Sequence, residues 1–191
     1  MEDSSPSKAI ISTDAVRHNV ARLRQLCGVP VMAVVKADGF GLGAERVARA
    51  ALAGGATELG VATCEEALAL RSAGVEEPIL AWLIHDDAPL ADAVNGSIRL
   101  SMTSVAQLEK IANIAATQHR CAEIELELET GMHRSGAARS DWEELFAAAS
   151  DAENRGSVRV IGVWTHLAGA DRLAYSAALT LLDEGLARAR R

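Results

Sequence analysis

Apolar and polar residues alternate along the chain in two distinct rhythms. Residues 13–27 carry apolar side chains at helical spacing, which predicts a helix capped by Thr13 and Asp14. After Gly28 and Pro30, short apolar runs alternate with longer alanine-rich segments of helical period. The runs predict strands at residues 31–37, 58–63, 78–84, 98–104, 122–130 and 158–167. The longer segments predict helices at residues 44–55, 64–74, 105–118 and 141–154, and a closing helix from about Asp171.

Six strand-plus-helix units in series indicate an α/β fold with a parallel sheet. Because all-parallel sheets need helices on their faces, the pattern leaves two architectures open, a (β/α) barrel and a doubly wound sheet. A closed barrel of this kind has eight strands and typically about 250 residues. With 191 residues, the chain therefore predicts either an open sheet or part of a barrel.

Composition and charge narrow the class of protein. Hydrophobic residues make up 49% of the chain and aromatic residues only 3%, which fits one globular domain with a core of Ala, Val and Leu. The net charge of -7 argues against nucleic-acid binding and favours small-molecule or protein partners. No apolar stretch reaches the roughly 20 residues of a membrane span, and the first residues lack the features of a signal peptide. These features predict a cytoplasmic protein.

The three cysteines have neither the spacing of metal ligands nor that of a disulfide framework. They are Cys27, Cys64 and Cys121. We expect ordinary core thiols and no metal site.

Lys36 ends an apolar run in the stretch VVKADGFGLG, residues 34–43. A lysine at the end of a buried strand costs free energy unless it is paired, neutralised or used covalently. The glycines and the helix predicted after them could hold an anion beside it. A partly buried lysine can also form a Schiff base with an aldehyde. From the local pattern alone, a lysine that simply reaches solvent explains the residue better.

A second feature is the alternation in AEIELELET, residues 122–130. It places Glu123, Glu125, Glu127 and Glu129 on one face of a strand and apolar residues on the other. If helices cover the apolar face, the glutamates face a barrel interior or a cleft and need cations nearby, for which Arg134 is the candidate. The alternative is a strand whose glutamates face water.

A third feature connects these strands. His166 ends the apolar run VIGVWTHL, and Lys36, Arg134 and His166 each follow a predicted strand. Parallel strands bring their carboxyl ends to one edge of the sheet, so we expect the three side chains to converge there.

Four segments resemble the N-terminal part of bacterial alanine racemases, particularly the actinobacterial branch. They are VVKADGFG, the stretch from ELGVAT to ILAWL, TGMHRSG and GVWTHLAGAD, which follow one another in the family's order from about residue 9. The resemblance implies a pyridoxal 5′-phosphate-binding barrel of the TIM type, followed by a β domain, in a head-to-tail homodimer. Residues 1–191 would then be one incomplete barrel domain with about six of its eight βα units, without the C-terminal β domain.

The resemblance also implies roles for individual residues. Lys36 corresponds to the lysine of the internal aldimine and Arg134 to the arginine that donates to the cofactor's phenolic oxygen. His166 corresponds to the histidine packed against the pyridine ring, and Phe40 stands near the phosphate, where most members have a tyrosine. Lys36, Arg134 and His166 are thus the predicted catalytic residues, and all four are predicted to bind cofactor. The implied reaction is the interconversion of L- and D-alanine for cell-wall synthesis, with a tyrosine of the partner subunit as the second base.

The chain departs from the family pattern at several positions. Phe40 lacks the tyrosine hydroxyl, Leu42 replaces a histidine, and Glu129 replaces an aspartate. Many members carry a carbamylated lysine where this chain has Glu127, and we hypothesise that Glu127 orients Arg134 in its place. The chain also ends before the last two barrel strands, and nothing maps Tyr175 to the catalytic tyrosine. This pattern fits a truncated racemase or a relative completed by self-association.

Three functions follow from these observations. The first is a pyridoxal-phosphate-dependent alanine racemase represented by its N-terminal part. The second is a non-catalytic module of the same family that binds pyridoxal phosphate or a protein partner. The third, a single-domain barrel that handles pyridoxal phosphate, is disfavoured because such proteins have different motifs around their lysine.

Overall fold

The computed structural model describes residues 9–169 and 172–190. Its six strands are β1 (Met32–Val34), β2 (Glu58–Val61), β3 (Ile79–Ala81), β4 (Arg99–Met102), β5 (Ala122–Glu127) and β6 (Val158–Trp164). They form one sheet in the order β1-β2-β3-β4-β5-β6, and every neighbouring pair is parallel. The predicted α/β fold with six parallel strands alternating with helices is confirmed.

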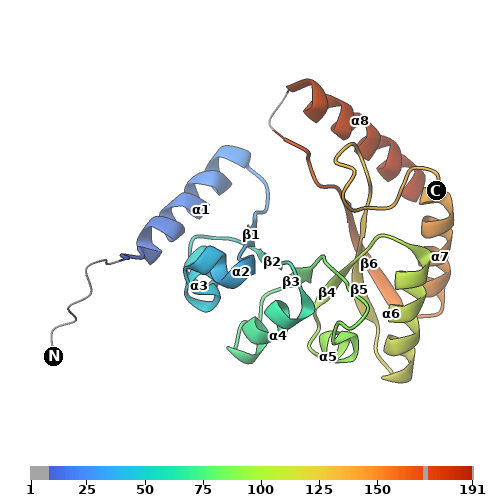
Figure 1. Cartoon of the computed structure of the whole chain (residues 1–191), viewed down its shortest axis with the longest axis horizontal. Helices are drawn as coiled ribbons and strands as arrows, with labels where there is room; N and C mark the ends of the chain where they lie inside the picture. The colour runs from blue at the N-terminus through green and yellow to red at the C-terminus, as the bar shows by residue number, and fades with distance from the viewer. Residues whose placement is uncertain (1–8, 170–171, 191) are drawn as a thin grey trace.

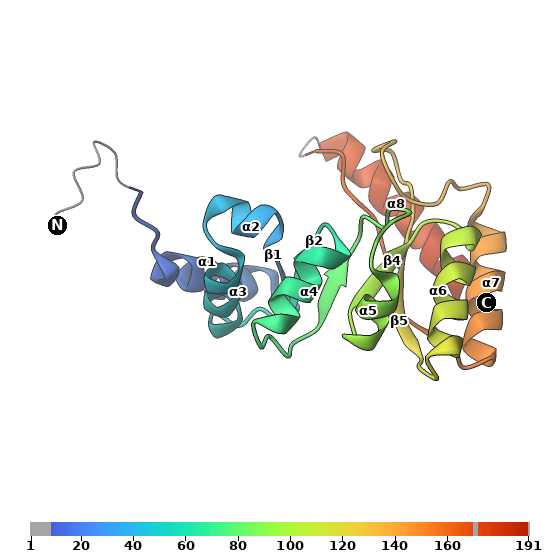
Figure 2. The same cartoon turned by 60° about the horizontal axis from the view of Figure 1, so that its bottom comes forward.

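Helices lie along the outer side of the curved sheet (Figure 1). They are α1 (Thr13–Cys27), α2 (Lys36–Gly41), α3 (Ala44–Ala53), α4 (Cys64–Ser72), α5 (Leu90–Asn95), α6 (Val105–Thr117), α7 (Trp142–Asn154) and α8 (Arg172–Ala189). Figure 1 shows α1 and α8 on opposite sides of this arc, and Figure 2 shows α1 at one end and α7 at the other, with α8 behind α6. The short elements α2 and α5 were not predicted, and the predicted start of the last helix at Asp171 lies outside the described residues. No helix among residues 9–169 and 172–190 is long and apolar enough to cross a membrane.

Strand β5 shows how the sheet separates its two faces. Ile124, Leu126 and the following Leu128 are buried in the main core, which also contains Leu108 of α6 and Leu145 of α7. The alternate residues, including Glu125 and Glu127, face the concave side, as the alternation predicted. Burying the aliphatic face under helices therefore forces the glutamate face into the interior of the arc.

Two local predictions were wrong. The side chain of Ser12, rather than Thr13 or Asp14, caps α1 by accepting a hydrogen bond from the Ala15 amide. Of the cysteines, only Cys64 is buried, and burial raises the pKa of its thiol to about 11. Cys27, the last residue of α1, and Cys121, the residue before β5, are exposed.

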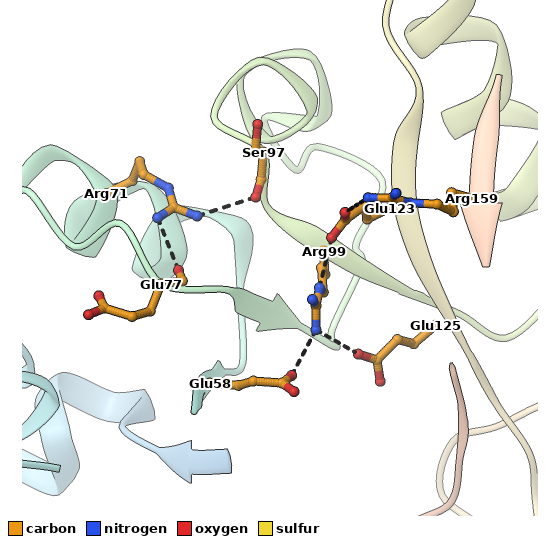
Figure 3. A network of polar contacts seen from close by, with 8 residues as sticks. All are labelled: Glu58, Arg71, Glu77, Ser97, Arg99, Glu123, Glu125 and Arg159. Carbon is orange, nitrogen blue, oxygen red and sulfur yellow. Dashed lines mark hydrogen bonds and ion pairs between the residues drawn. The ribbon is translucent and has the colours of Figure 1, made fainter. Parts of the chain in front are cut away.

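Arg99 is the cation that compensates the interior carboxylates at the amino-terminal end of the sheet (Figure 3). Its guanidinium lies 2.8 Å from Glu58 of β2 and 2.8 Å from Glu123 of β5, with Glu125 at 3.9 Å. Arg159 of β6 also pairs with Glu123. The need for a cation near these glutamates is confirmed, but Arg99 fills it for Glu123 and Glu125, whereas the sequence pointed to Arg134.

Within this cluster, the pKa values of Glu123 and Glu125 are shifted in opposite directions. Burial raises the pKa of Glu123, but hydrogen bonds from Arg99 and Arg159 outweigh burial and hold this pKa below its usual range. For Glu125, burial and the neighbouring Glu58 and Glu123 raise the pKa, and the charge of Arg99 only partly opposes them. Three carboxylates face two guanidinium groups here, and Glu125, at 3.9 Å from Arg99, is the carboxylate whose charge is least compensated.

We expect Glu123→Gln and Glu125→Gln to change stability with opposite pH dependence. A lowered folded-state pKa stabilises the protein above the ordinary glutamate range, so Glu123→Gln should cost about 1 kcal/mol at neutral pH and little in acid. A raised folded-state pKa means that the wild type loses stability as pH rises from the ordinary pKa of glutamate to the raised one. The Glu125→Gln variant should therefore become more stable relative to the wild type as pH rises across that window. Urea unfolding at several pH values measures both differences, and parallel profiles for the two variants would contradict the assignment.

Candidate active site

Three of the four predicted site residues surround one cavity at the carboxyl ends of the strands. The cavity has a volume of about 250 Å³ and is lined by Met32, Val34, Lys36, Leu80, Trp82, Glu125, Arg134, Trp164 and His166. Lys36 follows β1, Arg134 follows β5 and His166 follows β6, so the expected convergence of the three side chains is present. A larger cavity of about 370 Å³ lies at the opposite ends of β4–β6, away from these side chains.

Two tryptophans form the apolar part of the cavity wall. Trp82, just after β3, and Trp164, at the end of β6, meet edge to face with ring centroids 6.5 Å apart. Trp164 also donates a hydrogen bond from its indole nitrogen to the Ser101 hydroxyl of β4, at 3.1 Å. A Cβ atom at Gly60 would lie 2.9 Å from both Met32 and Trp82, so only glycine fits between them.

Arg134 and His166 contact each other directly. Nη2 of Arg134 lies 3.1 Å from Nδ1 of His166. Since a guanidinium has only donors, Nδ1 must accept, and the imidazole proton lies on Nε2. Burial, the charge of Arg134 and the charge of Lys36 all lower the pKa of His166. The histidine is therefore neutral at neutral pH.

The turn that carries Arg134 is fastened to β5 and β6 by polar side chains. Glu129 accepts hydrogen bonds from the amides of Gly131 and His133, the latter at 2.7 Å. The hydroxyls of Thr130 and Thr165 lie 2.7 Å apart, and Thr165 also donates to the Leu128 carbonyl at 2.7 Å. These bonds hold the segment after β5 against the residue that precedes His166.

Glu127 is the most deeply buried of the interior carboxylates, with 1% of its surface exposed. One oxygen accepts a hydrogen bond from the Ser135 hydroxyl at 2.6 Å, and the other has no hydrogen-bond partner among residues 9–169 and 172–190. Burial raises the pKa of Glu127, while the Ser135 hydrogen bond and the charge of Arg134 oppose the increase. The carboxyl thus lies within electrostatic range of Arg134, whose hydrogen bond goes to His166.

The fourth predicted site residue lies elsewhere. The Phe40 side chain is 63% exposed and does not line the cavity, and Leu42 is exposed as well. The start of α3, which the sequence offered as an anion site, already has its first amide, that of Ala44, bound to the Asp38 carboxylate at 2.7 Å. A cofactor role for Phe40 stays a prediction.

Sequence reasoning missed several residues that shape the cavity. Trp82 and Trp164 stand at strand ends, so their pattern could have been noticed, since large aromatic residues are rare in this chain. The inward position of Arg99 and Ser101 could not be recognised from the sequence, because a single polar residue that faces inward on a strand resembles one that faces solvent. Among residues 9–169 and 172–190, no group of three His, Cys, Asp or Glu side chains could hold a metal ion.

The side chains around the cavity offer three kinds of interaction to a small ligand. Lys36 offers an amine, the tryptophans offer flat apolar surface, and Arg134 offers hydrogen-bond donors. His166 presents a neutral ring beside them.

Comparison with known proteins shows the family of this chain. A family model described as alanine racemase, N-terminal domain, matches residues 11–190. The chain belongs to this family. The alanine racemase of Salinispora tropica is 44% identical over 179 residues, which cover 92% of this chain and 48% of that protein. The chain thus spans about half the length of the curated relatives it matches.

Solved alanine racemases have the same fold. The enzyme from D-cycloserine-producing Streptomyces lavendulae superimposes with a TM-score of 0.91 at 40% identity, covering 93% of this chain and 48% of that one. The alanine racemase of Bacillus anthracis, solved with bound L-Ala-P, gives a TM-score of 0.79 at 26% identity, covering 93% and 47%. The resemblance to the N-terminal barrel of actinobacterial alanine racemases is confirmed.

Proposed function

We propose that this chain supplies the cofactor-binding part of a pyridoxal 5′-phosphate-dependent alanine racemase that interconverts L- and D-alanine. The observation that carries the proposal is the meeting of Lys36, Arg134 and His166, from three separate strands, around one cavity. Family membership and the Bacillus anthracis relative with its bound L-Ala-P support a small amino acid as the substrate. A homodimer and a cytoplasmic location stay predictions.

Five residues of the cavity have a defined part in this proposal. When bound, pyridoxal phosphate supplies an electron-withdrawing ring that acidifies the α-hydrogen of an amino acid. The Lys36 amine would hold the cofactor through its aldehyde, and Nζ would take or return a proton on one face of the substrate. Arg134 donates hydrogen bonds to the cofactor, and the neutral His166 ring supports it without adding a charge. Trp82 and Trp164 exclude water. Tyr175 does not line the cavity, so the second proton-transfer group lies outside this set.

Glu127 is the residue that we assign to orienting Arg134. Its unpartnered oxygen is buried within range of the Arg134 charge, and Ser135 fixes the other oxygen. A fixed carboxylate within electrostatic range of a flexible guanidinium favours the guanidinium positions that lie nearer to it. In this arrangement Glu127 orients Arg134, as hypothesised from the sequence, and the position that it favours is the one on His166.

The pKa of His166 reports whether Glu127 does this. If Arg134 leaves His166 in Glu127→Gln, the nearby positive charge is lost and the pKa of His166 rises, toward the value seen in Arg134→Gln. Direct loss of a negative charge would shift this pKa in the opposite direction, so the sign identifies the cause. Nuclear magnetic resonance titration of His166 measures it, with His18 on α1 as an internal control. A lowered pKa in Glu127→Gln, the sign expected from the charge loss alone, would show that Glu127 does not orient Arg134.

Covalent labelling tests the proposed function itself. The 191-residue chain is mixed with pyridoxal 5′-phosphate and reduced with borohydride, and the modified lysine is identified by mass spectrometry. We expect labelling at Lys36, which Lys36→Ala abolishes, with Lys110 on α6 as the control lysine. Absence of a label at Lys36 would contradict the assignment of this residue to the cofactor.

Deuterium exchange then separates the racemase from the second candidate function, the non-catalytic module. Exchange of the α-hydrogen of D- or L-alanine in deuterated water supports proton transfer by the chain. Labelling of Lys36 without such exchange favours the module for the 191-residue chain alone.

A further inference from the structure

The four residues after Lys36 form a left-handed turn. Ala37, Asp38, Gly39 and Phe40 have φ between 52° and 62° and ψ between 37° and 50°. This region is unfavourable for residues with a Cβ atom, and only glycine enters it freely. Three of the four residues are therefore held there by other contacts, and the position of Lys36 depends on those contacts.

Gly39 anchors the turn against α3. A Cβ atom there would lie 3.1 Å from the Val47 side chain and 3.3 Å from the Ala44 backbone, so the turn can pack this closely only with glycine. The Gly39 amide donates to the Val35 carbonyl at 2.9 Å. The far end of the turn is closed by the Asp38 carboxylate on the Ala44 amide.

Glu66 closes the near end, next to Lys36. Its Oε1 accepts a hydrogen bond from the Ala37 amide at 2.6 Å, across 29 residues of sequence. Its Oε2 accepts from the amides of Ala62 at 2.8 Å and Thr63 at 3.3 Å. One half-buried carboxylate therefore ties the residue after Lys36 to the end of the neighbouring strand β2.

The bond to Ala37 is additional to the normal role of a glutamate at this position. Glu66 stands third in α4 and forms a capping box with Thr63, which requires only the Thr63 amide. The ionised carboxylate has enough lone pairs for all three amides, whereas a carboxamide has one acceptor oxygen. The site thus selects a carboxylate over a glutamine at position 66.

We propose that Glu66 is a positioning residue for Lys36, which fixes the start of the left-handed turn so that the lysine amine is directed into the cavity. This inference rests on the proposed attachment of the cofactor at Lys36. Glu66 itself does not line the cavity, and it acts through the Ala37 amide.

Glu66→Gln in the 191-residue chain tests the proposal with two measurements. Hydrogen exchange of the amides of residues 37–43 reports on the turn without any cofactor, and we expect about tenfold faster exchange at Ala37. Borohydride-trapped labelling of Lys36 reports on the amine, and we expect half-maximal labelling at about tenfold higher pyridoxal phosphate concentration. Unchanged exchange in α7 shows that the variant is folded.

Glu65→Gln is the matched control. Glu65 lies one residue earlier in the first turn of α4, is exposed and pairs with His85 at 3.4 Å, whereas the Ala37 amide is bound by Glu66. The substitution removes the same charge from the same helix end and should leave both measurements at wild-type values. Thr63→Ala removes the hydroxyl of the capping box and keeps the carboxylate of Glu66, so it should weaken α4 without reducing the labelling of Lys36.

Each result of these measurements either supports or overturns the proposal. Unchanged exchange at Ala37 in Glu66→Gln overturns the proposal, and so does faster exchange with normal labelling, because the bond would then be structural only. Equal effects from Glu65→Gln would assign the change to helix charge and overturn it too. Failure of the wild type to be labelled at Lys36 rejects the proposed function, while the exchange comparison still decides whether Glu66 holds the turn.

Discussion

Burial of one sheet face under helices is the constraint on which the rest of the structure depends. Because aliphatic residues of β5 pack under α6 and α7, its glutamates are forced onto the concave side. Interior carboxylates cost free energy unless cations compensate them. Arg99 is placed where one guanidinium reaches Glu58 and Glu123, and its contacts join β2, β4 and β5. The ionic cluster thus follows from the alternation of side chains along a single strand.

The same parallel arrangement separates the structural end of the sheet from its chemical end. The Arg99 cluster occupies the amino-terminal half of the interior, and Glu125, which belongs to it, also lines the cavity together with Trp82 and Trp164. At the carboxyl ends of the strands, the side chains of Lys36, Arg134 and His166 meet. The segments that carry them are held by hydrogen bonds from neighbouring segments. Glu66 fixes the residue after Lys36, and Glu129 fixes the turn before Arg134. Rigid support of this kind lets a cavity place a few polar groups accurately.

The sequence predicted those features that depend on periodicity and on strand ends. Six parallel strands and the meeting of Lys36, Arg134 and His166 follow from alternating patterns and from the geometry of parallel sheets. The left-handed turn and the bond from Glu66 to Ala37 could not be predicted, because they depend on backbone angles and on a contact across 29 residues. Phe40 lies outside the cavity for the same reason, since the turn directs its side chain to solvent.

In the proposed function, three strand ends build one cavity that receives the cofactor at Lys36. A crystal structure of the chain after reaction with pyridoxal 5′-phosphate and borohydride tests it most directly. We predict electron density that continues from Lys36 Nζ into the cavity lined by Trp82, Arg134 and His166. Density that leaves Lys36 toward solvent, with Arg134 still bound only to His166, would contradict the account.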